Sequence, residues 1–186
     1  MPAKRADSPS YGIVEEDGLR LDEPRVEDGP ELWRVARDTP ELDLNSPYSY
    51  VLWCRDFADT SVVVRDQDNI CAFLTGYVRP ESPGTFFVWQ VAVHRDYRGR
   101  RLGRRMLDHY GRRMVRRGCT HLEATVTPGN TASLNLFRSY ARDHAADLDR
   151  STLFDADLFP GGHEPEELLR IGPLTAPDGR PSAGER

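Results

Sequence analysis

Residues 85–103 have the sequence TFFVWQVAVHRDYRGRRLG. The first nine of them are apolar at nearly every position, with Gln90 as the interior polar side chain, and this is typical of a central strand buried on both faces. From Leu102 onward, apolar residues recur every four positions and arginines fill the opposite face, until Gly118 ends the pattern. This periodicity predicts an amphipathic helix. The stretch therefore encodes a buried strand, a turn that contains glycine, and a helix.

The remainder of the chain adds strands and helices around this unit. Three more helices are predicted at residues 28–38, 46–57 and 131–141. Further strands are predicted at residues 61–65, 70–78, 120–127 and 167–171, and the first two form a hairpin around a polar turn. We expect an α/β (α+β) fold, in which a mixed central sheet of about six to seven strands carries helices on both faces.

Length and composition indicate one folded domain. At 186 residues the chain can bury a substantial apolar core. Both ends are polar, so we expect tails without fixed structure at residues 1–14 and 174–186 and a domain at residues 15–173. The chain contains neither an apolar run that could span a bilayer nor a secretory signal, which favours a cytoplasmic protein without membrane contact. The three cysteines are scattered and odd in number, so neither a disulfide framework nor a metal cluster is expected.

The turn between the strand and the helix has the composition of an anion-binding site. A helix start leaves backbone N–H groups without partners and carries a partial positive charge. Gly99 and Gly103 lack the Cβ that would block close approach, and the surrounding arginines attract anions, so a diphosphate can bind here. A plain strand-to-helix turn with a solvated cationic face has the same composition, and the pattern alone leaves both alternatives open.

This turn resembles the acetyl-CoA signature of the GNAT superfamily, Arg/Gln-x-x-Gly-x-Gly/Ala. Arg98 and Gly103 match its ends, while Arg101 occupies the central glycine position. Further along, the stretch from Asn130 to Phe137 resembles the Asn-x-x-Ala-x-x-x-Tyr element, whose tyrosine often protonates the departing thiolate. In this chain the tyrosine position is Phe137, which has no proton to give, so another group or water must protonate the thiolate. The resemblance implies the GNAT fold and acetyl-CoA as co-substrate.

Four separated stretches sharpen the resemblance. They are LDLNSPYSY at residues 42–50, FVWQVAV at 87–93, LEATVTP at 122–128 and GGHEPEELLRI at 161–171. Together they resemble the L-2,4-diaminobutyric acid acetyltransferases over roughly residues 15 to 174. The resemblance implies acetylation of the γ-amine of diaminobutyrate, a step of ectoine biosynthesis linked to osmotic stress, by a homodimeric enzyme without a metal.

The cofactor contacts are expected along the strand and the turn. The backbone of Val91, Ala92 and Val93 would pair with the pantetheine arm as an added strand does. The diphosphate is expected on residues of the turn and the helix start, namely Arg98, Gly99, Arg100, Arg101, Leu102, Gly103 and Arg104. Asn130 is a helix cap by its chemistry, and with Ser133 it is a coenzyme A contact by resemblance.

The acceptor site must accommodate a diamine and deprotonate it. A lysine-like amine has a pKa near ~10.4, so the site has to remove a proton before the nitrogen can attack the thioester directly in a ternary complex. We assign Asp43 and Glu166 to amine recognition and, with Trp89, to the catalytic set, because two ammonium groups call for acids and the resemblance puts the tryptophan in the amino-acid pocket. The alternatives are a loop or capping role for the aspartate, a solvated charge for the glutamate and a core aromatic for the tryptophan.

Further substrate contacts are proposed at Tyr48, Thr125, Thr127 and Glu164. The tyrosine is equally compatible with a core position that satisfies its hydroxyl. The two threonines share one face of their strand by alternation, and packing is the alternative role for both.

Three nearby polar residues have other expected roles. Glu123 is either a water-mediated base or the partner of an arginine. Gln90 points to the face opposite Trp89 and is expected to satisfy a buried backbone group. His163 is left out of the ligand set, because it precedes an acidic residue where the family often has a histidine after one.

Two competing functions are compatible with parts of the sequence. The first is a GNAT enzyme for another amine, such as a polyamine, an antibiotic or a peptide N-terminus. The second is nucleic-acid binding, since ten arginines lie between Arg95 and Arg117. The net charge of −5 and the confinement of these arginines to one helix and its turn argue against a nucleic-acid partner.

Overall fold

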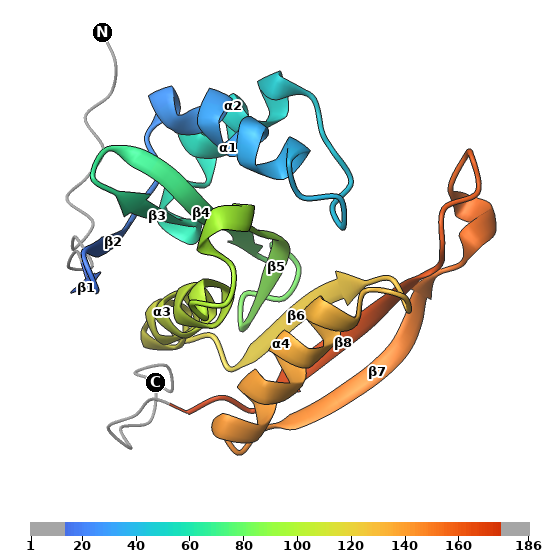
Figure 1. Ribbon diagram of the computed structural model, residues 1–186. Helices are drawn as coiled ribbons and strands as arrows, with labels where there is room; N and C mark the ends of the chain where they lie inside the picture. Colours follow the sequence, from blue (N-terminus) through green and yellow to red (C-terminus); the bar gives the residue numbers. More distant parts are fainter. Residues whose placement is uncertain (1–13, 176–186) are drawn as a thin grey trace, which may run out of the picture.

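The computed structural model describes residues 14–175, which form one mixed sheet with helices on both faces (Figure 1). The strands are β1 (Val14–Glu16), β2 (Leu19–Asp22), β3 (Val62–Asp66), β4 (Asn69–Val78), β5 (Thr85–Val93), β6 (His121–Val126), β7 (Asp147–Phe154) and β8 (Glu166–Gly172). The helices are α1 (Gly29–Arg37), α2 (Pro47–Asp56), α3 (Leu102–Arg116) and α4 (Thr131–Asp143). Short 3-10 turns lie at η1 (Val26–Asp28), η2 (Ala58–Thr60), η3 (Arg95–Tyr97) and η4 (Ala156–Leu158).

The strand order confirms the predicted fold class. It is β1-β2-β3-β4-β5-β6-β8-β7, and within the described chain β5 and β6 are the one parallel pair. The sheet has eight strands, more than the six to seven expected. Five of them were located in the sequence, whereas β1, β2 and β7 were not. None of the helices in residues 14–175 is long and apolar enough to cross a membrane.

The expected tails fall largely outside the part of the chain that the structure describes, at residues 1–13 and 176–186. The C-terminal boundary that we placed at residue 173 is too early. Leu174 is buried in the core, and its N–H donates to the carbonyl of Thr120 at 2.7 Å. Ordered packing therefore continues past the last strand.

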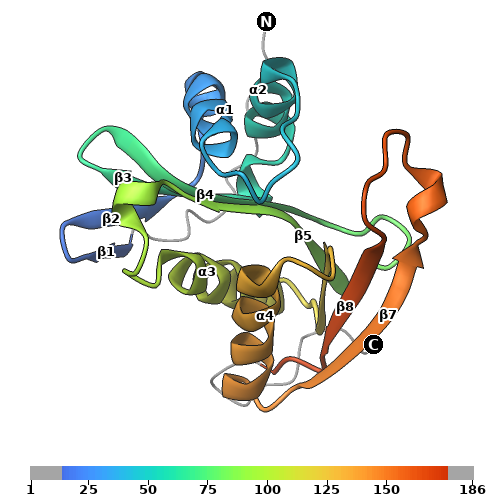
Figure 2. The same cartoon turned by 45° about the vertical axis from the view of Figure 1, so that its right-hand side comes forward.

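Two hydrophobic cores cover the two faces of the sheet. Figure 2 shows α1 and α2 on one face and α3 and α4 on the other. Met106, Tyr110 and Met114 of α3 are completely buried in the larger core, as their spacing predicts. On the opposite face, α1 and α2 pack over Phe73 and Ala92 of the central strands. The helices thus hold β4 and β5 from both sides.

The feature that creates a functional site is the separation of β5 from β6. The two strands pair in parallel from Thr85↔His121 to Val88↔Ala124, and no pairing follows, although β5 continues to Val93. In Figure 1 the two strands open away from one another. The far half of β5 consequently has an edge without a neighbouring strand in the described chain, and its backbone groups on that edge are available to a ligand.

Candidate active site

A cleft of about 560 Å³ lies where β5 and β6 separate. Its walls come from the loop before α2, from β5, from the end of β6, from the start of α4 and from the loop before β8. The lining residues are Pro40, Glu41, Leu42, Asp43, Asn45, Val88, Trp89, Gln90, Val91, Thr125, Val126, Thr127, Gly129, Asn130, Ser133, Phe137, His163, Glu164 and Glu166. Segments distant in sequence, including all four stretches that carried the resemblance, thus meet in one cavity.

The turn before α3 has the geometry of an anion site. Gly99 has φ +81°, and Arg101, the residue before the helix, has φ +58° in the left-handed region. Helical hydrogen bonding begins with the N–H of Arg105 to the carbonyl of Arg101 at 3.0 Å, so the amides of the three residues between them point out of the helix start. A Cβ at Gly103 would meet only ordinary contacts at 3.7 Å, so packing within the protein does not require glycine there. Space is kept open beside the amides.

The arginines of this segment have different environments. Arg98 is half-exposed and donates through Nη2 to Glu41 Oε2 at 3.3 Å. Arg104 had been expected at the diphosphate, but its guanidinium is engaged with Asp108 at 2.9 Å and with Asp143 at 2.7 Å. Its side chain is 14 % exposed and joins α3 to α4, so we correct its role to one of helix packing, with only its backbone N–H left in the turn.

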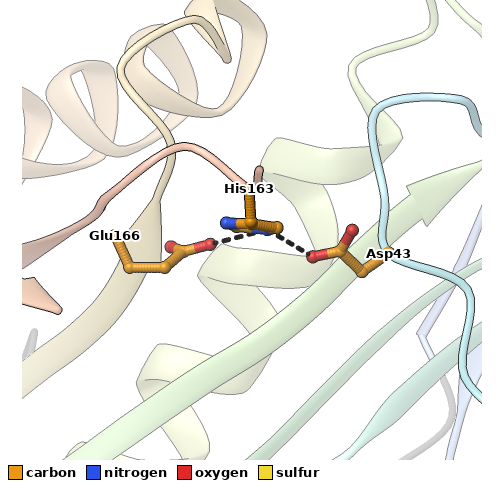
Figure 3. A group of neighbouring side chains, drawn as sticks. All are labelled: Asp43, His163 and Glu166. Carbon is orange, nitrogen blue, oxygen red and sulfur yellow. Dashed lines mark hydrogen bonds and ion pairs between the residues drawn. The ribbon is translucent and has the colours of Figure 1, made fainter. Parts of the chain in front are cut away.

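Within the cleft, three side chains form a cluster that can receive a cation, namely Asp43, His163 and Glu166 (Figure 3). His163 Nε2 lies 2.9 Å from Asp43 Oδ2 and 3.8 Å from Glu166 Oε1. The side chain of the aspartate is 80 % exposed, whereas that of the glutamate is 17 % exposed. One ligand atom from each residue lies within 4.8 Å of the others. This is an arrangement in which carboxylates hold a protonated imidazole or an ammonium group.

The cluster shifts the acid–base properties of its members. The hydrogen bond to Asp43 raises the pKa of His163, and a second bond from Nδ1 to the Glu164 carbonyl at 2.5 Å acts in the same direction. Burial raises the pKa of Glu166, while a hydrogen bond from Thr125 and the charge of His163 oppose this shift. The pKa values of His163 and Glu166 are thus both shifted in the direction that favours the protonated form.

The comparisons with known proteins identify the family of this chain. The profile described as the acetyltransferase (GNAT) family matches residues 27–141. A protein of Streptomyces avermitilis named L-2,4-diaminobutyric acid acetyltransferase is 54 % identical over 178 residues, covering 94 % of this chain and 99 % of that protein. Its namesake in Streptomyces coelicolor is 58 % identical over 161 residues, covering 85 % and 95 %. This chain is a member of the diaminobutyrate acetyltransferase family.

Solved structures agree with the family assignment. A diaminobutyrate acetyltransferase from Paenibacillus lautus, solved with its substrate L-2,4-diaminobutyric acid and coenzyme A, superimposes with a TM-score of 0.80 at 36 % identity and covers 83 % of this chain and 95 % of that one. The ribosomal-protein-S18-alanine N-acetyltransferase of Escherichia coli gives a TM-score of 0.66 at 16 % identity over 87 % and 98 % of the two chains, which shows the shared fold alone.

Among the residues expected at the acceptor side of this diaminobutyrate acetyltransferase family member, Trp89 lines the cleft, and its ring stacks on Trp53 of α2 with centroids 4.3 Å apart. Thr125, Thr127 and Glu164 also line the cleft. Tyr48 differs: it is 70 % exposed and does not belong to the cleft lining of the described residues. The core position considered for this tyrosine is therefore wrong, and its substrate contact stays a prediction.

The structure decides the alternatives for two buried polar residues. Glu123 is 3 % exposed, and its carboxylate is paired with Arg170 and, at 2.7 Å, with Arg79, so it is the partner of arginines. Gln90 donates through Nε2 to the backbone carbonyl of Asp43 at 3.0 Å, which confirms that it satisfies a backbone group.

Of the remaining residues expected at the cofactor, Val91, Asn130 and Ser133 line the cleft. Val91 lines it from β5, while the side chain of Ala92 turns into the core under α1 and α2. Asn130 caps α4 by accepting the N–H of Ser133 at 3.0 Å, and Ser133 and Phe137 line the cleft one helical turn apart. Sequence reasoning left His163 out of the ligand set. The available signal was its place directly after two glycines and three residues before Glu166.

Proposed function

We propose that this chain transfers the acetyl group of acetyl-CoA to the γ-amine of L-2,4-diaminobutyrate and so makes the Nγ-acetyl intermediate of ectoine biosynthesis. The observation that carries this proposal is the carboxylate–imidazole cluster in the cleft where β5 and β6 separate, on a chain whose β5 leads into the glycine-bearing turn before α3. A diamine suits the cluster and a diphosphate suits the turn. The names of the relatives agree with this pairing of ligands.

The cofactor would lie along the open edge of β5. Its pantetheine amides would pair with the backbone of residues 91–93 as an added strand, because pairing with β6 ends at Val88. Its diphosphate would accept N–H groups of residues 99–104, where Gly99 and Gly103 leave room for the phosphate oxygens. This arrangement would bring the thioester beside Trp89, where β5 leaves β6.

The acceptor would occupy the cluster. Asp43, with its exposed carboxylate, would hold the α-ammonium group at the cleft mouth. Glu166 would accept a proton from the γ-ammonium group, because burial raises its pKa toward that of a useful base. The freed nitrogen would then attack the thioester carbon and the bond to sulfur would break. The nitrogen would lose its second proton as the amide forms, and water or a neighbouring group would pass a proton to the thiolate. Direct transfer leaves no acetylated enzyme.

Regioselectivity requires the site to oppose intrinsic chemistry. An α-amine has a pKa of about 8 and a lysine-like amine one of about 10, so near neutrality the α-nitrogen is more often neutral in solution. Fixing the α-nitrogen as an ammonium against a carboxylate while aligning the γ-nitrogen with the thioester reverses this preference.

The test is a thiol-release assay with acetyl-CoA across a panel of amines, followed by NMR of the product. We expect diaminobutyrate to be preferred and the γ-amide to be the main product. Asp43→Asn and Glu166→Gln keep the shape of the site but remove charge, so at least one should raise KM strongly and allow some α-amide. A mainly α-acetylated product from the unaltered protein, or unchanged rate and regiochemistry in both variants, would contradict the proposal.

We also propose that the enzyme is a cytoplasmic homodimer. The family resemblance implies a dimer, and β7 forms an edge of the sheet with exposed apolar side chains at Leu153 and Phe154, followed by Leu158 at 65 % exposure. Exposed apolar groups on an open edge strand favour association with a second copy. Light scattering after gel filtration tests this, with Leu158→Asp expected to weaken the dimer. A monomer at micromolar concentration would contradict it.

A further inference from the structure

Gln90 is the buried polar side chain near the middle of β5, and the two ends of its amide have different surroundings. The residue is 4 % exposed and lines the cleft. Its Nε2 donates to the Asp43 carbonyl at 3.0 Å, whereas its Oε1 is buried without a hydrogen-bond partner in the described protein. Burying an amide costs free energy unless hydrogen bonds compensate, so packing alone does not account for glutamine at this position.

Two other buried hydroxyl groups lie on the same face of the sheet as Gln90. Thr75 of β4 is the cross-strand partner of Gln90, and Tyr50 of α2 packs against Phe73, two residues earlier on the same strand. The hydroxyls of Thr75 and Tyr50 are also buried without partners. Among the described residues, the hydrogen bond that the Gln90 amide makes is the one from Nε2 to the Asp43 carbonyl.

The loop that carries Asp43 depends on this contact. The aspartate side chain is 80 % exposed, so apart from its 2.9 Å contact with His163 its position depends on its backbone rather than on packing. The other hydrogen bond to its carbonyl comes from Asn45 in the same loop, at 3.4 Å. Gln90 thus supplies the shorter bond, and the one that ties this carbonyl to the sheet.

We infer that Gln90 is a positioning residue for the amine site: by holding the Asp43 carbonyl it fixes the carboxylate of Asp43 opposite Glu166. This inference rests on the function proposed above. The contact is the same before and during acetyl transfer, so its loss weakens diaminobutyrate binding and leaves the chemical step largely unchanged.

The first experiment compares steady-state kinetics of Gln90→Met with the unaltered enzyme. Methionine has a similar shape but cannot donate the hydrogen bond, and losing one such bond predicts a rise of about fivefold in KM for diaminobutyrate. We expect KM for acetyl-CoA and kcat to stay within about twofold. Thr60→Val is the matched control, since it removes one buried hydrogen bond to a backbone carbonyl, that of Gly76, outside the cleft, and it should leave both KM values unchanged. Equal increases in both KM values would overturn the inference.

A double-mutant cycle separates positioning from a general structural effect. In an Asp43→Asn background there is no carboxylate to position, so Gln90→Met should add less than about twofold to KM for diaminobutyrate. The same increase in KM for diaminobutyrate in both backgrounds would contradict the inference but leave the proposed function intact. If Asp43→Asn itself leaves KM unchanged, the proposed amine site and the inference fail together.

Gln90→Glu provides the test if the methionine variant does not fold. A protonated carboxyl at position 90 can donate to the Asp43 carbonyl, whereas an ionised one repels it. KM for diaminobutyrate relative to the unaltered enzyme should therefore rise with pH. A ratio independent of pH would contradict positioning through this bond.

Discussion

Arg98 Nη2 lies 3.3 Å from Glu41 Oε2, so an ion pair joins the turn before α3 to the loop that carries Asp43. Both side chains are roughly half-exposed, and such pairs contribute about 0–1 kcal/mol. The arginine is also an expected ligand of the diphosphate. If Arg98 binds the diphosphate as expected, cofactor binding and the acceptor loop would compete for the same guanidinium.

This competition predicts that Glu41→Gln strengthens coenzyme A binding. Removing the carboxylate frees Arg98 for the diphosphate, and the expected gain is about two- to fivefold in Kd, smaller at high salt. Calorimetry at low and high ionic strength measures it. Glu81→Gln makes the same change of net charge at an exposed position outside the cleft and should leave Kd unchanged. Equal gains in the two variants would indicate a general charge effect instead.

Arg101→Gly should stabilise the protein modestly. The arginine has φ +58°, and a non-glycine residue in this region costs about 1–2 kcal/mol. Glycine removes that strain, but about half of the gain is lost because glycine makes the unfolded chain more flexible. Denaturant unfolding should show a net gain of about 0.5 kcal/mol. Gln67→Gly is the matched control, because its φ is +55° in the β3–β4 turn. A loss of stability only at position 101 would mean that the arginine side chain makes a compensating contact.

The position of His163 predicts how substrate binding depends on pH. Its hydrogen bond to Asp43 raises its pKa, so the imidazolium persists above the usual range and would compete with the substrate ammonium group proposed to bind Asp43. As pH rises through this raised pKa, the positive charge is lost and kcat/KM for diaminobutyrate should increase. His163→Gln keeps a polar side chain without titration and should flatten this limb of the profile. An identical pH profile in the variant would contradict the assignment.

Strong periodicity made the centre of the fold predictable, and its absence hid the edges. The bounds of β5 coincide with the predicted strand, because a strand buried on both faces is apolar throughout. β7, with the sequence DLDRSTLF, was missed because nearly all of its side chains are exposed on the sheet edge, so no alternation marks it. The ion pair of Arg104 could have been predicted, because Asp108 lies four residues further along the same helix.

The candidate site was predictable in its members but not in its geometry. Asp43 and Glu166 were assigned as acids for the two ammonium groups and Trp89 from the resemblance, and the structure brings all three to one cleft. The central place of His163 depends on how the loop before β8 turns, and that loop has left-handed glycines at positions 161 and 162. Local patterns do not encode the direction of such a loop, because it is fixed by contacts with a segment 120 residues away.

Phe137 leads to the last prediction, which concerns the departing thiolate. The side chain is 3 % exposed and lines the cleft from α4, at the position where the related signature has a tyrosine. A ring without a hydroxyl can pack but cannot donate a proton, so Phe137→Leu should lower the free energy of unfolding by about 1 kcal/mol and leave kcat within about threefold. Leu134→Val removes one buried methylene from the same helix outside the cleft lining and should have a similar effect on stability. Both variants are compared by denaturant unfolding and by thiol release at saturating substrates. A hundredfold loss of kcat in folded Phe137→Leu, with normal binding of both substrates, would show that the ring aligns the thioester, and the source of the thiolate proton would then have to be sought among groups that this ring orients.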